Sequence, residues 1–240
     1  MYNEEHGVTF GTYHTWRDWH LIPASRPVIA PPKERTSYVT VEGMDGAWDL
    51  SQAVSGRPVF DDREGNLDFY VENDYWDWNT AYTTILNALG GRRMTVILDD
   101  DPSHFYRGAC WVDKWKSDKG HSTISIKYKL YPYKREKFSS VEPWEWDTFN
   151  FDLDIIREYK DIQVNGSYYL TVPGMKEANR ATVTVTSGTM TVMVTTPGVL
   201  VTYATLQNGG SLEVVVENQD YTFAFTGTGT VTVDYRGGLL

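Results

Sequence analysis

The chain has 240 residues and a net charge of −10, with 41% hydrophobic and 22% charged residues, a composition typical of a folded protein rather than a disordered one. The acidic charge argues against a nucleic-acid-binding surface, because such surfaces use Lys and Arg to displace counterions from phosphates. A single cysteine, Cys110, excludes an intrachain disulfide and a multi-cysteine metal site, and we expect it to be a buried structural thiol.

Residues 1–20 are polar, so no signal peptide is predicted. No apolar run approaches the ~20 residues that a membrane span requires. We therefore expect the protein to be made in a cytoplasm and to have no membrane partner.

Strand patterns occupy much of the first half. Alternation of apolar and polar residues predicts strands over 66–72 and 122–131. The apolar face of the first is Leu67, Phe69 and Val71, and that of the second is Ile124, Ile126, Tyr128 and Leu130.

One helix is predicted between these strands, over residues 78–89, with Asp77 as its N-cap and Gly90 ending it in a left-handed turn. A strand over 94–98 follows at once. The stripe of the helix that we expect to be buried is Trp78, Ala81, Tyr82, Ile85, Leu86 and Leu89. The first half is therefore expected to be a small β-sandwich or half-barrel with one helix laid across it.

The three carboxylates Asp99, Asp100 and Asp101 lie at the end of the predicted strand. Consecutive side chains of a strand alternate in direction, so three in a row rarely converge on one ion. We expect a solvated turn here rather than a metal site.

A junction is predicted over residues 132–146, which contain prolines and a charge cluster. It separates a domain of residues 1–137 from one of residues 138–240. The second domain carries five Lys or Arg and twelve Asp or Glu, a charge of −7, which leaves −3 for the first.

Short Thr- and Val-rich alternating runs closed by Gly, Pro or Asn fill the second domain. They predict an antiparallel β-sandwich. The expected strands are 167–172, 180–187, 189–196, 199–206, 211–217, 221–227 and 229–236.

No catalytic set is visible, so we expect no enzyme and no cofactor. There is no nucleophile motif, and no pair of carboxylates is singled out, although Glu142, Glu145 and Asp147 lie among Trp144 and Trp146. A glycan-hydrolysing enzyme with an unrecognised carboxylate pair stays as a weak alternative.

The N-terminal segment combines apolar side chains with prolines at 23, 27, 31 and 32, so it cannot be regular sheet throughout. Left exposed, these side chains would form an apolar patch too large for a monomer. They can be buried in their own domain or against another copy, and we favour the other copy. The residues expected to contact a neighbouring subunit are Trp16, Arg17, Trp19, His20, Leu21, Ile22 and Arg26.

An ordered series of local patterns over about the first 135 residues resembles the distal tail proteins (Dit-like baseplate hub proteins) of long non-contractile-tailed bacteriophages. The segments are FGTYHTWRDWH at 10–20, GMDGAWDLS at 43–51, REGNLDFYV at 63–71, and the run from Tyr106 to Lys134. In those proteins the stretch of residues 10–71 includes a loop that wraps onto a neighbouring copy. The resemblance implies that the second domain is a galectin-like or carbohydrate-module-like sandwich.

The resemblance also implies a function in the virion, at the distal end of the tail. Copies, six in number, would close into a ring that joins the tail-tube protein to a tail-associated hub protein and docks receptor-binding or side-fibre proteins. DNA would pass through the ring without specific binding. Deletion of residues 10–35 is expected to leave monomers.

A carbohydrate-binding protein is the main alternative, with a sugar held on the second domain. Exposed aromatic rings of a sandwich can stack on sugar faces. The residues that could do so are Tyr168, Tyr169, Tyr203 and Tyr221.

Overall fold

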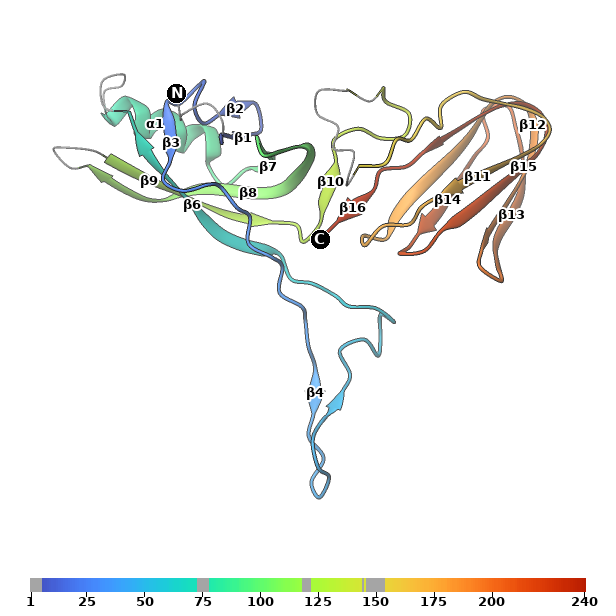
Figure 1. The fold of residues 1–240 in the computed structure, drawn as a ribbon, viewed down its shortest axis with the longest axis horizontal. Helices are drawn as coiled ribbons and strands as arrows, with labels where there is room; N and C mark the ends of the chain where they lie inside the picture. Colours follow the sequence, from blue (N-terminus) through green and yellow to red (C-terminus); the bar gives the residue numbers. More distant parts are fainter. Residues whose placement is uncertain (1–5, 73–77, 118–121, 144, 146–153) are drawn as a thin grey trace. The chain divides into compact units, whose positions relative to one another are not determined.

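A computed structural model of the chain describes residues 6–72, 78–117, 122–143, 145 and 154–240 (Figure 1). The chain divides into two compact units. The first contains residues 1–101 and 105–132, and the second contains residues 102–104 and 133–240. The division therefore falls at Pro132–Tyr133, inside the junction predicted over 132–146.

The first unit is built on an antiparallel sheet with the strand order β2-β1-β7-β8-β9-β6-β3. The predicted strands over 66–72, 94–98 and 122–131 are confirmed as β6, β7 and β9. The bounds of the strands are β1 Val8–Phe10, β2 Tyr13–His14, β3 Leu21–Pro23, β6 Arg63–Val71, β7 Arg93–Leu98, β8 Asp101–Ser117 and β9 Ser122–Leu130.

Helix α1 (Trp78–Leu89) has the predicted bounds. Its buried stripe is narrower than expected, because Ala81, Ile85 and Leu89 are buried whereas Leu86 is 38% exposed. Gly90 ends the helix with a φ of 45°, and its amide donates to the Leu86 carbonyl oxygen at 2.9 Å. The expected N-cap, Asp77, lies outside the described residues.

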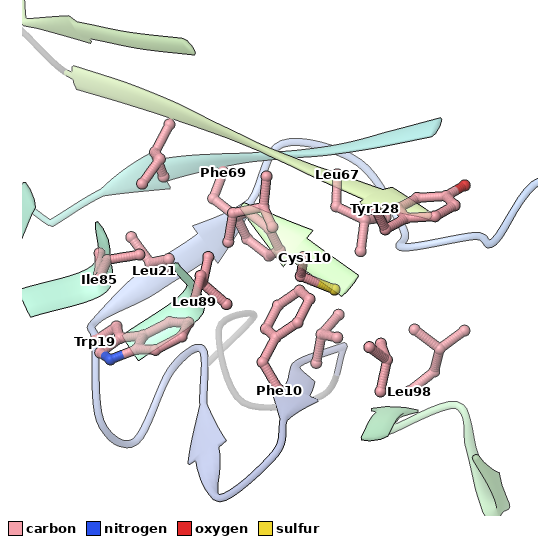
Figure 2. Packing of buried hydrophobic residues seen from close by; sticks show 14 of the residues in the cluster. Phe10, Trp19, Leu21, Leu67, Phe69, Ile85, Leu89, Leu98, Cys110 and Tyr128 are labelled. Carbon is pink, nitrogen blue, oxygen red and sulfur yellow. The ribbon is translucent and has the colours of Figure 1, made fainter. Parts of the chain in front are cut away.

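The core of the first unit lies between this helix, the sheet and the N-terminal segment (Figure 2). The predicted apolar faces of β6 and β9 all point into it. Cys110 is free and fully buried, and burial raises the pKa of its thiol to about 12, so it is an inert structural residue as expected.

The second unit contains a five-stranded antiparallel sheet with the order β11-β15-β12-β13, and β14 also pairs with β12. The bounds are β11 Ile162–Val172, β12 Asn179–Thr196, β13 Val199–Gln207, β14 Ser211–Val216 and β15 Tyr221–Asp234. Alternation of Val and Thr on β12 places the valines inside and the threonines outside, as at Val183 and Thr184. A further short pair, β10 (Lys134–Glu136) with β16 (Gly238–Leu239), lies in the same unit. Among the described residues, no helix is long and apolar enough to cross a membrane.

Glycines make two of these strands continuous where the sequence predicted breaks. The expected strands 180–187 and 189–196 form β12, and 221–227 and 229–236 fall mainly on β15. Gly188 has a φ of 79°, and a Cβ there would lie 2.0 Å from the Thr228 carbonyl oxygen. The glycines therefore permit a close approach of the paired strands β12 and β15, with a bulge between Val185 and Ser187, instead of a turn.

Candidate assembly surface

A long arm of residues 33–61 leaves the first unit between β3 and β6 (Figure 1). It is a hairpin that contains the strand pair β4 (Tyr38–Val39) and β5 (Trp48–Asp49). The stem is closed by hydrogen bonds from the Asp61 amide to the Lys33 carbonyl oxygen and from the Arg35 amide to the Val59 carbonyl oxygen, each 2.8 Å. An ion pair between Arg35 and Asp61 crosses the same stem.

The buried side chain of Arg63 fixes the base of the arm. Its guanidinium donates from Nη1 to the Ala30 carbonyl oxygen at 2.9 Å and from Nε to the Pro132 carbonyl oxygen at 2.7 Å. The Tyr128 hydroxyl accepts from the Ala30 amide at 2.9 Å. Desolvation by burial lowers the pKa of Arg63, and Tyr106 and Tyr128 act against this shift. The guanidinium stays a charged donor at neutral pH. The chain is therefore held firmly where it enters and leaves the arm.

No residue of the arm is buried. Every position from Glu34 to Pro58 is exposed apart from Met44 and Ser51, which are half-buried. The exposed large apolar side chains are Tyr38, Val39, Val41, Trp48, Leu50 and Val54, of which Val54 is 102% exposed. An isolated two-stranded hairpin is marginally stable in water, and an apolar surface of this extent marks an interaction site.

The structure corrects the expectation that Trp19 and Leu21 contact a neighbouring copy. Trp19 and Leu21 are fully buried in their own unit, and Trp19 stacks between Phe10 and Tyr13 with ring centroids 6.1 and 5.5 Å away (Figure 2). Strands β1, β2 and β3 bring the N-terminal segment into the sheet, so Trp19, Leu21 and Ile29 pack in the protomer's own core, whereas Val28 stays 67% exposed. Deletion of residues 10–35 would remove that core.

The other residues expected at the interface lie at or near the surface of the same unit. Trp16, His20 and Ile22 are half-buried, and the Trp16 ring meets the His20 ring edge-on at 5.6 Å. Arg17 and Arg26 are exposed, but Arg26 Nε donates to an Asp100 oxygen within the protomer at 2.9 Å.

Two of the three consecutive carboxylates have structural roles that the prediction of a solvated turn missed. Asp99 accepts from the Gly7 amide and pairs with His14 Nε2, both at 2.9 Å, and Asp100 pairs with His6 and Arg26. Burial opposes ionisation of Asp99, but these partners outweigh it and lower its pKa. The carboxylates thus tie the N-terminal segment to the end of β7.

The four candidate sugar-binding tyrosines do not share one surface. Tyr169 and Tyr203 are 70% and 63% exposed, whereas Tyr221 is buried. Tyr168, adjacent to Tyr169 on β11, points to the opposite face of the sheet, where it pairs with buried Phe225.

Of the carboxylates that could have suggested a hydrolase, Glu145 pairs with Lys137 at 3.6 Å, and Asp147 lies outside the described residues. Glu142 accepts from the Ser139 amide and from Arg236 Nη2, each at 2.7 Å, and these interactions lower its pKa against the effect of burial. A general acid needs a raised pKa instead. Within the described ranges, no group of three or more His, Cys, Asp or Glu could hold a metal ion.

Neither a family model nor a curated protein matches the sequence. The structure is similar to that of the Dit protein (gp 19.1) of phage SPP1, described as a paradigm of the hub adsorption apparatus in phages that infect Gram-positive bacteria. The TM-score is 0.64 at 14% sequence identity, over 98% of this chain and 99% of that one. The chain therefore has the fold of SPP1 Dit.

Proposed function

We propose that this chain is a structural protein of the distal end of a phage tail and that its copies close into a ring, with the arm of each copy lying on its neighbour. An assembly built from heterologous contacts of this kind stops growing at a defined size only if the rotation between neighbouring copies closes into a ring. Six copies is the number that the sequence resemblance implies. The SPP1 Dit fold supports the location, because that protein belongs to a hub adsorption apparatus.

The observation that carries the proposal is the arm. Six large apolar side chains project from a hairpin that has no core of its own, while its base is anchored by a buried arginine. A second copy is the occupant that can satisfy every arm at once, since a cyclic assembly gives each copy one arm to donate and one surface to receive. The near-balanced charge of residues 1–137 lets copies meet without strong mutual repulsion.

The ring would connect the tail-tube protein on one face with a tail-associated hub protein on the other. The second unit would dock receptor-binding or side-fibre proteins. DNA would pass the bore without being held, since an acidic protein offers few cations to its phosphates. No bond-making step is needed for this role.

The experiment compares the intact chain with a variant in which residues 37–57 are replaced by a two-residue Asn-Gly turn. The replacement keeps the stem at Arg35 and Asp61 and removes the apolar residues. Sedimentation velocity across a micromolar concentration series is expected to give a ring for the intact chain and a monomer for the variant, at unchanged thermal midpoint. A variant that still forms the ring would overturn the assignment of the arm.

A further inference from the structure

A row of side chains crosses the outer face of the second unit's sheet. Tyr169 on β11 pairs with Ala224 on β15, Ala224 with Met193 on β12, and Met193 with Tyr203 on β13. Directly paired residues of antiparallel strands point to the same face. The two tyrosines and Met193 are exposed, whereas Ala224 is 8% exposed and forms a low floor between them.

The rows beside this one contain hydroxyl and amide side chains. They have the same four-strand registry and are exposed or half-buried. One row is Ser167, Thr226, Thr191 and Thr205, the next is Asn165, Thr228, Thr189 and Gln207, and on the other side lie Thr171, Thr222, Thr195 and the exposed Leu200. We call these rows together with the tyrosine row the neutral face.

Charge is absent from the neutral face, although the whole chain carries −10. Two of its hydroxyls are hydrogen-bonded to each other, Thr191 Oγ1 and Thr205 Oγ1, at 3.2 Å. The strands stand ~4.8 Å apart, so the two tyrosines lie about 14 Å from each other across three strand spacings. The surface therefore has an aromatic ring on each side of Ala224 and Met193, with hydroxyl and amide side chains in the rows beside them.

We propose that the neutral face binds a neutral polysaccharide of the bacterial cell surface. The apolar C–H faces of sugar rings pack on Tyr169 and Tyr203, and sugar hydroxyls pair with the threonine, asparagine and glutamine side chains. The bacterial source rests on the proposed tail function, whereas the carbohydrate chemistry rests on the neutral face alone.

Two observations favour a neutral sugar over other occupants. A phosphate-bearing polymer would need Lys or Arg, and the neutral face has neither. Protein interfaces are enriched in Tyr, Trp, Met and Arg, so the tyrosine row alone does not separate a sugar from a protein, and it is the threonine, serine, asparagine and glutamine side chains of the rows beside it that favour a sugar.

The test uses the full-length protein on an array of bacterial oligosaccharides. The array carries neutral glucose, galactose, rhamnose and N-acetylhexosamine oligomers together with glycerol-phosphate teichoic acid. Wild type is expected to bind neutral members, Tyr169→Ala and Tyr203→Ala to lose at least tenfold in affinity, and Tyr169→Phe to stay within threefold because the ring is kept. Arg180→Ala is the matched control, since it alters an exposed side chain elsewhere on β12.

Binding to no neutral member, binding of teichoic acid alone, or unchanged affinity in both alanine variants would overturn the proposal. Loss of another tail protein from virions built with Tyr203→Ala would identify protein docking as the role of this face and also overturn it. Thermal midpoints establish that each variant folds. The oligomeric state of every sample is measured in the same buffer, so failure of sugar binding and failure of ring formation are seen separately.

Discussion

Replacement of Trp48 by alanine tests the arm with a single side chain. Trp48 is 60% exposed in the protomer. If a neighbour covers it, about 150 Å² is removed from water, which at ~25 cal/mol per Å² is worth about 4 kcal/mol. The cost of ordering the side chain lowers the net value to about 2–3 kcal/mol per contact, or about 30- to 150-fold in each contact's equilibrium constant. A closed ring loses this contact once for every copy, so the concentration at half-assembly is expected to rise by at least ~30-fold.

Mass photometry and sedimentation over a concentration series measure this midpoint directly. Tyr169→Ala is the matched control, because it removes an exposed aromatic ring from the second unit, and its midpoint is expected to stay within threefold of wild type. The reasoning is refuted if Trp48→Ala assembles at the wild-type midpoint, or if the control shifts as much as Trp48→Ala does.

Three further predictions concern stability. Gly188→Ala is expected to cost at least ~3 kcal/mol in urea unfolding and Gly198→Ala only about 1 kcal/mol, because both have a positive φ but only Gly188 would press a Cβ on the backbone; equal costs would contradict this. Trp19→Ala should lose about 3–5 kcal/mol and Trp19→Phe less than half of that, since the buried indole nitrogen has no hydrogen-bond partner among the described groups; near-equal losses in thermal unfolding would count against a packing role. The pKa of Asp99 is lower in the folded protein than its value of about 3.9 in the unfolded chain, so the ionised carboxylate stabilises the fold above pH ~3.9. This stability is lost as pH falls through the folded-state pKa. Asp99→Asn should therefore lose less stability than wild type between pH 5 and pH 3, and parallel losses would refute the assignment.

The periodicity of apolar residues was sufficient to predict the regular elements of the first unit. The apolar sets Leu67, Phe69, Val71 and Ile124, Ile126, Tyr128 repeat every second residue, and a repeat of two fixes which face is buried. The helix bounds followed from spacing and from Gly90. Leu86 was misplaced because a stripe drawn from hydrophobicity alone is wider than the surface that the sheet can cover.

The arm could not be located by the same reasoning. Both residues 10–30 and residues 33–61 combine apolar side chains with turn residues, so composition does not separate them. The difference is tertiary: β1 and β3 find partners in β7 and β6, whereas β4 and β5 pair only with each other. A signal was present in GMDGAWDLS, where Gly43 and Gly46 mark a turn followed by exposed Trp48.

Sequence patterns also predicted turns at glycines where strands β12 and β15 of the second unit continue without a break. Gly188 and Gly229 look like strand ends, because a turn and a close crossing both need a residue without Cβ. The neutral face could not be predicted either, because it depends on the registry among four strands. Tyr169 and Tyr203 were predicted as individual candidates, and only the pairing through Ala224 and Met193 places them in one row.

Labelling of Val54→Cys with a fluorescent maleimide measures whether a neighbouring copy covers the arm. The native Cys110 is buried, with the pKa of its thiol raised to about 12, so the introduced thiol is the reactive one. If a neighbour covers the arm, labelling is fast in dilute monomer and at least tenfold slower in the assembled ring. A ring that labels at the monomer rate would contradict this coverage.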